Sequence, residues 1–87
     1  MHERNQECIE DLQQRQNSIR FTELITICTR WFGPPRLNGG SHHVYRMPWQ
    51  GDPRINIQRG NGGTAKVYQV KQVIAALVKM EDEHGKA

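Results

Sequence analysis

The chain has 87 residues, enough for one compact domain with a modest hydrophobic core and too few for a large enclosed substrate cavity. Hydrophobic residues make up 36% of the sequence, which is typical of a folded protein, and no stretch approaches the roughly 20 apolar residues that a membrane-spanning helix needs. The net charge of +3 is small, but the charges are distributed unevenly.

Positive charge is concentrated in the middle of the chain. Residues 18–72 contain eight basic and two acidic residues, whereas acids outnumber bases in residues 1–17 and 73–87. A basic centre fits a protein that contacts a polyanion such as RNA there. Many ordinary domains have a similar solvated basic face, so the charge pattern alone leaves both interpretations open.

The N-terminal segment, residues 1–17, is acidic and is predicted to be an extension of a main domain at residues 18–84. Its composition is compatible with a helix, and Cys8, Ile9 and Leu12 give it a thin apolar stripe. It has no apolar run like that of a signal peptide, so we expect a cytoplasmic protein.

The first strong helix signal covers residues 21–32, where apolar residues recur at helical spacing. Ser18 and Thr22 are candidates for its N-cap. The Gly-Pro-Pro sequence at residues 33–35 should end this helix, because proline lacks the amide hydrogen that continues the hydrogen-bond ladder.

Three short strands are predicted next, at residues 36–38, 41–47 and 54–58. Turn-forming residues separate them, with a tight hairpin at residues 38–40 and a longer connection at residues 48–53. We expect these strands to pair as one antiparallel sheet.

The second strand contains two adjacent histidines, which must point to opposite faces of the sheet. We expect Val44 to face the helices, which would put His42 on that side, near the edge of the sheet. His43 and Tyr45 would then lie on the open face.

A glycine-rich segment at residues 60–63 precedes a second amphipathic helix at residues 68–82. Because no Lys-Ser or Lys-Thr pair follows the glycines, we interpret them as a flexible connector rather than a phosphate-binding loop. The resulting order is helix, three-stranded antiparallel sheet and helix, with both helices on one face and a possible extra helix at the N-terminus. This order predicts an α+β fold with the layout of the double-stranded-RNA-binding domain.

Residues 39–45, Gly-Gly-Ser-His-His-Val-Tyr, resemble the Gly-Ser-His signature of the HicA toxins, which share this α-β-β-β-α layout. Residues 54–58 and 65–72 are similar to the third strand and the last helix of one branch of that family. The resemblance extends over residues 18–80. The acidic N-terminal extension and the stiff Gly-Pro-Pro at residues 33–35 depart from the plainest members of the family.

The resemblance implies an endoribonuclease toxin that cleaves mRNA, is neutralised by a HicB-type antitoxin and uses His42 as its catalytic residue. RNA supplies its own nucleophile, the 2′-hydroxyl, so cleavage needs a base but neither a metal nor another cofactor. An imidazole suits this role because it exchanges a proton near neutral pH. Six residues are predicted to bind RNA. Gly40 and Ser41 are small and would allow a phosphate close to the backbone. Four basic residues would hold phosphates: Arg46, Arg54, Lys66 and Lys71.

No metal site is predicted from the cysteines or histidines. Cys8 and Cys28 belong to no Cys-x-x-Cys pair and are expected to be free, mostly buried thiols. A site formed by His42, His43 and His84 is not expected, because ligands at neighbouring strand positions diverge and no cysteine or acidic residue shares their spacing.

Two other functions fit the same fold. One is a non-catalytic RNA-binding module, although the last helix carries only Lys71 and Lys79 and ends in acidic residues. The other is a protein-binding domain whose sheet edge or basic face meets an acidic partner. Tyr45 and Trp49 are candidates for base stacking, but aromatic residues near a hairpin more often pack against the core.

Overall fold

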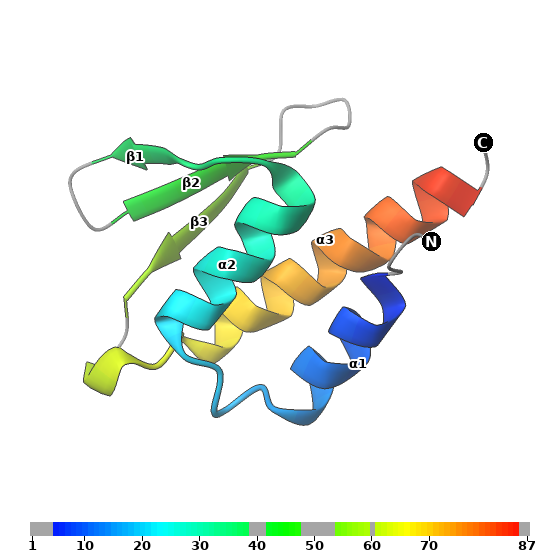
Figure 1. Ribbon diagram of the computed structural model, residues 1–87. Coiled ribbons are helices and arrows are strands. Elements are labelled where there is room, and N and C mark those ends of the chain that lie inside the picture. The colour runs from blue at the N-terminus through cyan, green and yellow to red at the C-terminus, as the bar shows by residue number, and fades with distance from the viewer. Residues whose placement is uncertain (1–4, 39–41, 48–53, 60, 86–87) are drawn as a thin grey trace.

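The computed structural model describes residues 5–38, 42–47, 54–59 and 61–85. Over these residues the fold is α+β, with three helices and an open three-stranded antiparallel sheet (Figure 1). In chain order the elements are α1 (Asn5–Gln14), α2 (Phe21–Phe32), β1 (Arg36–Asn38), β2 (His42–Arg46), β3 (Arg54–Gln58), the 3-10 turn η1 (Asn61–Gly63) and α3 (Val67–Gly85).

The sheet has the order β1-β2-β3, so the histidine-bearing strand β2 is central. Both neighbouring pairs are antiparallel, as predicted. The bounds predicted for the first and third strands are confirmed, and β2 is observed over residues 42–46. Gly40, Ser41 and Trp49 lie outside the described residues, as do residues 39–40 of the predicted hairpin and the predicted connection at residues 48–53.

The helix predicted at residues 21–32 is confirmed as α2, but the predicted N-caps are wrong. Arg20 occupies the N-cap position in an extended conformation and makes no side-chain capping bond. The reason is that Arg20 pairs with Thr64 in an isolated bridge, which keeps the chain extended up to Phe21. At the other end the helix stops at Gly33, whose φ of 89° lies in the left-handed region that favours glycine.

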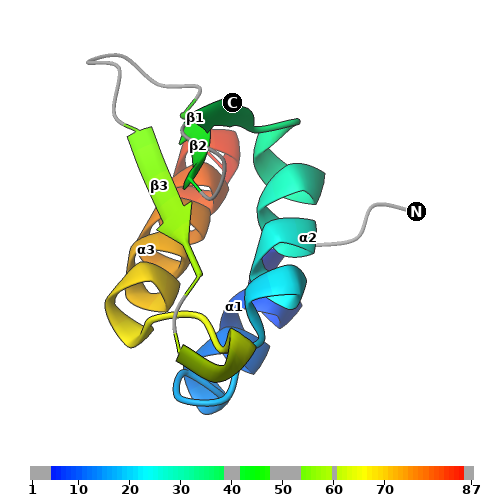
Figure 2. The ribbon, with the colours of Figure 1, turned by 90° about the vertical axis from the view of Figure 1, so that its left-hand side faces the viewer.

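The hydrophobic core lies between the sheet and the helices α2 and α3, which cover one face of the sheet (Figures 1 and 2). Helix α1 packs along α3, apart from the sheet (Figure 1). Its residues Ile9 and Leu12 belong to the same core cluster as Leu24, Ile57 and Leu77. The N-terminal segment is therefore helical and contributes to the single core of the molecule. None of the helices in the described part is long and apolar enough to cross a membrane.

The glycine-rich connection leads from β3 to α3 through η1. Gly62 and Gly63 have φ values of 67° and 78°, which glycine adopts without strain. Immediately after them, the Ala65 amide donates to the Ile19 carbonyl at 2.8 Å, and Ala65 also pairs with Arg59. Through these contacts of Ala65, the connection links the end of β3 to the segment that precedes α2.

Candidate functional site

The orientation of β2 is the reverse of the one predicted. Tyr45 is fully buried against α2, where its hydroxyl donates to the Ile25 carbonyl at 3.2 Å and lies 2.9 Å from Thr29 Oγ1. His43 also faces the helices, because its ring meets the Phe21 ring edge-on at a centroid distance of 5.4 Å. Side chains alternate along a strand, so His42 and its alternate neighbours lie on the open face.

The physical reason for this reversal is the size and chemistry of the tyrosine. The β2 sequence offers one apolar side chain to each face, Val44 to one and Tyr45 to the other. Tyr45 fills more of the core than a valine does. Its hydroxyl bonds to partners on α2, so burying the side chain leaves no polar atom without a hydrogen bond. Val44 is left half-buried on the open side.

The open face combines His42 with three arginines. Directly paired residues of antiparallel strands point to the same side, and the register pairs Arg36 with Val44, and Arg46 with Arg54. All three arginines therefore share the face of His42. No aspartate or glutamate occurs in the three strands, so the strand residues add no negative charge to this face.

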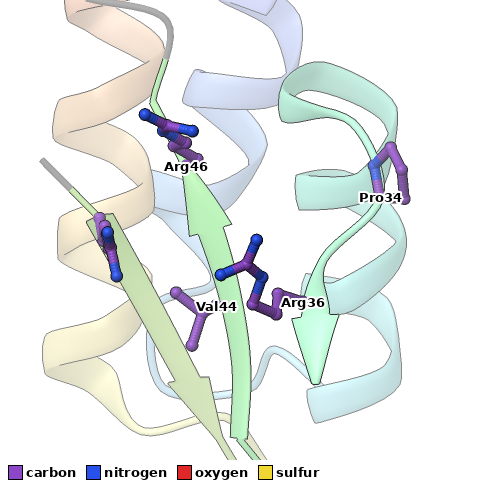
Figure 3. Close-up of a pocket in the computed structure, with 5 residues that line it drawn as sticks. Pro34, Arg36, Val44 and Arg46 are labelled. Atoms are coloured by element: carbon purple, nitrogen blue, oxygen red, sulfur yellow. The ribbon is translucent and has the colours of Figure 1, made fainter. Parts of the chain in front are cut away.

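The arginines surround a shallow hollow of about 180 Å³, which is lined by Pro34, Arg36, Val44, Arg46 and Arg54. In Figure 3, Val44 lies beside Arg36, Arg46 lies farther along the same strand, and the helices lie behind the sheet. The hollow is smaller than the roughly 300 Å³ at which pockets for whole small molecules begin. Its size suits a single anionic group held by guanidinium donors.

His42 lies in a different row of the sheet from these arginines. It is half-buried, and its backbone pairs with Gln58 on β3. A strand advances about 3.4 Å per residue, so the row of Arg36 and Val44 is about 7 Å from the row of His42. By the same rise, the backbone of Arg46 and Arg54 is about 14 Å away along the sheet.

Helix α3 fixes the edge strand beside His42 through the buried side chain of Gln69. The Gln69 Oε1 atom accepts the Gln58 backbone amide at 3.1 Å, and Gln69 Nε2 donates to the Tyr68 hydroxyl at 3.3 Å. An edge-strand amide would otherwise have no partner in this part of the fold. The bond therefore holds β3 in register next to the candidate base.

The neighbouring histidine has a packing role. His43 Nδ1 is buried and has no hydrogen-bond partner among the described residues. Its ring packs on Phe21, and the Arg59 guanidinium lies 5.2 Å from the centre of the Phe21 ring. Of the two adjacent histidines, only His42 lies on the face that is open to a substrate.

In comparisons with known proteins, no family model, curated protein or solved structure matches the chain. The candidate site is therefore described from its own residues. Of the predicted RNA-binding residues, Arg46 and Arg54 lie on the face of His42. Arg36 was not predicted as a site residue. The register of the predicted hairpin could have identified it, because that register places Arg36 opposite Val44, on the same face of the sheet.

The two predicted lysines lie away from the arginines. Lys66 precedes α3, where its carbonyl accepts the amides of Gln69 and Val70. Lys71 is exposed on α3, which packs on the opposite side of the sheet from His42. The structure therefore groups two of the four predicted basic residues with the histidine.

Metal-binding and redox groups are not gathered around His42. The described residues contain no group of three or more His, Cys, Asp or Glu side chains arranged to hold a metal ion, and the side chain of His84 lies outside them. Cys8 and Cys28 are free thiols, half-buried and buried respectively, as predicted. Burial raises the pKa of the Cys28 thiol above its ordinary range, which favours the unreactive protonated form.

Proposed function

We propose that the protein is a HicA-type endoribonuclease toxin that cleaves mRNA through His42. The observation that supports this proposal is the position of His42, the histidine of the Gly-Ser-His sequence, on the same open face as Arg36, Arg46 and Arg54. His43, the competing histidine, packs against Phe21 instead. The face thus combines one proton-exchanging group with cations that suit a polyanion.

In the proposed reaction His42 acts as the general base. It takes the proton from a ribose 2′-hydroxyl, and the oxygen attacks the adjacent phosphorus. The bond from phosphorus to the 5′-oxygen breaks, and that oxygen leaves with a proton. The products are a 2′,3′-cyclic phosphate and a 5′-hydroxyl end, with no cofactor required. DNA is excluded as a substrate because it lacks the nucleophile.

The other predicted residues are proposed to bind the RNA backbone. Arg46 and Arg54 hold phosphates on the open face, and arginine's planar fork of donors suits a phosphate better than lysine does. Lys66 and Lys71 contact RNA that passes the end of the sheet and reaches α3. Gly40 and Ser41, just before His42, let a phosphate approach the backbone.

The proposed cellular setting follows from the same family likeness. We place the protein in the cytoplasm, where a HicB-type antitoxin neutralises it. The order α2, three strands, α3 is proposed to be the double-stranded-RNA-binding layout, with α1 as an addition to it. The open sheet face is available for RNA because α2 and α3 cover only the opposite face.

The deciding experiment is RNA cleavage in EDTA by the wild-type protein, His42→Ala and His43→Gln. We expect His42→Ala to abolish cleavage without lowering the thermal unfolding temperature, because His42 lies at the surface of the sheet. His43→Gln should cleave RNA but unfold at a lower temperature, because it loses the contact with Phe21.

Equal cleavage by the wild type and His42→Ala would contradict the catalytic assignment. Tight RNA binding by the wild type without any cleavage would instead identify the non-catalytic RNA-binding module. A substrate with a single 2′-deoxynucleotide at the cleavage site provides the chemical control, since it keeps every phosphate and lacks only the nucleophile.

A further inference from the structure

We infer that the hollow between Arg36, Arg46 and Arg54 is a subsite for one non-scissile phosphate of the substrate RNA. The identity of the substrate rests on the proposed function, whereas binding of an anion in the hollow does not. The inference adds Arg36 to the RNA-binding residues and separates the phosphate held here from the phosphate that is attacked near His42.

The first argument is convergence. Each of the three strands contributes one arginine to the same hollow, and Val44 and Pro34 provide the uncharged remainder of its lining. Three guanidinium groups gather at this hollow, and the three strands contribute no acidic residue to the face. Guanidinium groups bind phosphate oxygens in pairs of parallel hydrogen bonds, which matches this arrangement.

The second argument is size. At about 180 Å³ the hollow admits a phosphate group but not a base and a sugar as well. The described strand residues on this face include no phenylalanine, tyrosine or tryptophan on which a base would stack, because Tyr45 faces the helices. The hollow therefore binds the backbone of the RNA and leaves its bases outside.

The third argument is distance. The rows that line the hollow are about 7 Å (Arg36 and Val44) and about 14 Å (Arg46 and Arg54) from the row of His42. A nucleic-acid strand advances about 3.4 Å per phosphate along a helix axis, and further when it is extended. The phosphate in the hollow is consequently about one to four nucleotides from the bond that His42 attacks. A dinucleotide has only one internucleotide phosphate, the one that is attacked, so it cannot occupy both places.

The anion site is tested without any cleavage by titrating inorganic phosphate and recording the Nε–Hε signals of the arginines by NMR. We expect saturable shifts for Arg36, Arg46 and Arg54, and in the double variant Arg36→Gln/Arg54→Gln the remaining Arg46 signal should no longer saturate over the same phosphate range. Arg20→Gln is the charge-matched control, because Arg20 is exposed at the opposite end of α2, about 18 Å away. Equal, unsaturable shifts of Arg20 and Arg36 would overturn the anion site.

The subsite for RNA is tested by comparing kcat/KM for a six-nucleotide RNA with kcat/KM for a dinucleotide. The wild type and Arg20→Gln should favour the longer substrate by at least about tenfold, and the double variant should lose most of that preference. An unchanged preference in the double variant would overturn the subsite. If phosphate binds in the hollow but the wild type cleaves no RNA, the anion site stands and the proposed ribonuclease function fails.

Discussion

The Tyr45 hydroxyl lies 2.9 Å from Thr29 Oγ1, and this contact anchors the central strand to α2 in the orientation that exposes His42. The same hydroxyl donates to the Ile25 carbonyl, and the Tyr45 ring also meets Phe32 edge-on. A buried aromatic residue on one face of β2 thus determines which histidine reaches the open face. The orientation of the candidate base is a consequence of core packing three residues away.

Tyr45→Phe is expected to lower the free energy of unfolding by about 1 kcal/mol, the usual net value of a lost hydrogen bond. The ring still fills the core, so the orientation of β2 and the proposed cleavage by His42 should be kept. Urea unfolding measures the loss. Thr22→Val is the control, since Thr22 is exposed on α2 and its hydroxyl can bond to water. An equal loss in the two variants would argue against an anchoring role for Tyr45.

Most of the fold follows from the spacing of apolar residues. Helix α2, strands β1 and β3 and the antiparallel order were predicted with their observed bounds, because periodicity and turn residues are local signals. Helix α3 begins one residue earlier and ends three residues later than the predicted range, 68–82. Helix ends depend on local capping contacts that periodicity does not report.

The predicted face of β2 was wrong because a short strand with one apolar residue on each side carries no decisive pattern. The choice between Val44 and Tyr45 depends on partners 16 and 20 residues away, Thr29 and Ile25. Sequence spacing does not report such tertiary partners. Arg36 was missed for a related reason, since its membership of the site depends on cross-strand register.

Gln69→Leu should lower the free energy of unfolding by about 1–3 kcal/mol, because it leaves the Gln58 amide without its acceptor at the edge of the sheet. The substitution keeps the side-chain volume, so a packing defect does not account for the loss. Hydrogen exchange at the Gln58 amide should accelerate more than exchange at the centre of β2. Gln72→Leu, at an exposed position of the same helix, should leave both measurements almost unchanged.

Alkaline pH is expected to destabilise the protein through Cys28. Burial raises the pKa of this thiol in the folded state, whereas the unfolded thiol ionises near its ordinary value of about 8.5. Above that pH the unfolded state has lost the proton and the folded state still holds it, so the free energy of unfolding falls as pH rises. The contribution is about 1.4 kcal/mol per pH unit until the folded pKa is reached.

The Cys28 effect is isolated by comparing the pH dependence of urea unfolding in the wild type and Cys28→Ala between pH 7 and 10. The variant should show a flatter decline, since other ionising groups are the same in both proteins. Cys8→Ala should change the slope less, because Cys8 is only half-buried. Parallel curves for the wild type and Cys28→Ala would contradict the assignment.

The dependence of RNA affinity on salt should report whether the arginines of the open face hold a phosphate. Each neutralised phosphate of a single strand contributes about −0.7 to the slope of log affinity against log salt, so the one phosphate held between Arg36, Arg46 and Arg54 should contribute about −0.7. Binding is measured in the His42→Ala background, which prevents cleavage. Adding Arg54→Gln should flatten the slope by up to about 0.7, because the phosphate then loses one of its partners. It should weaken binding of unrelated RNA sequences to a similar extent, because phosphates carry no sequence information. Adding Arg20→Gln instead should leave the slope unchanged. If Arg54→Gln and Arg20→Gln flatten the slope equally, RNA affinity depends only on the net charge of the protein, and the open face has no special role in binding RNA.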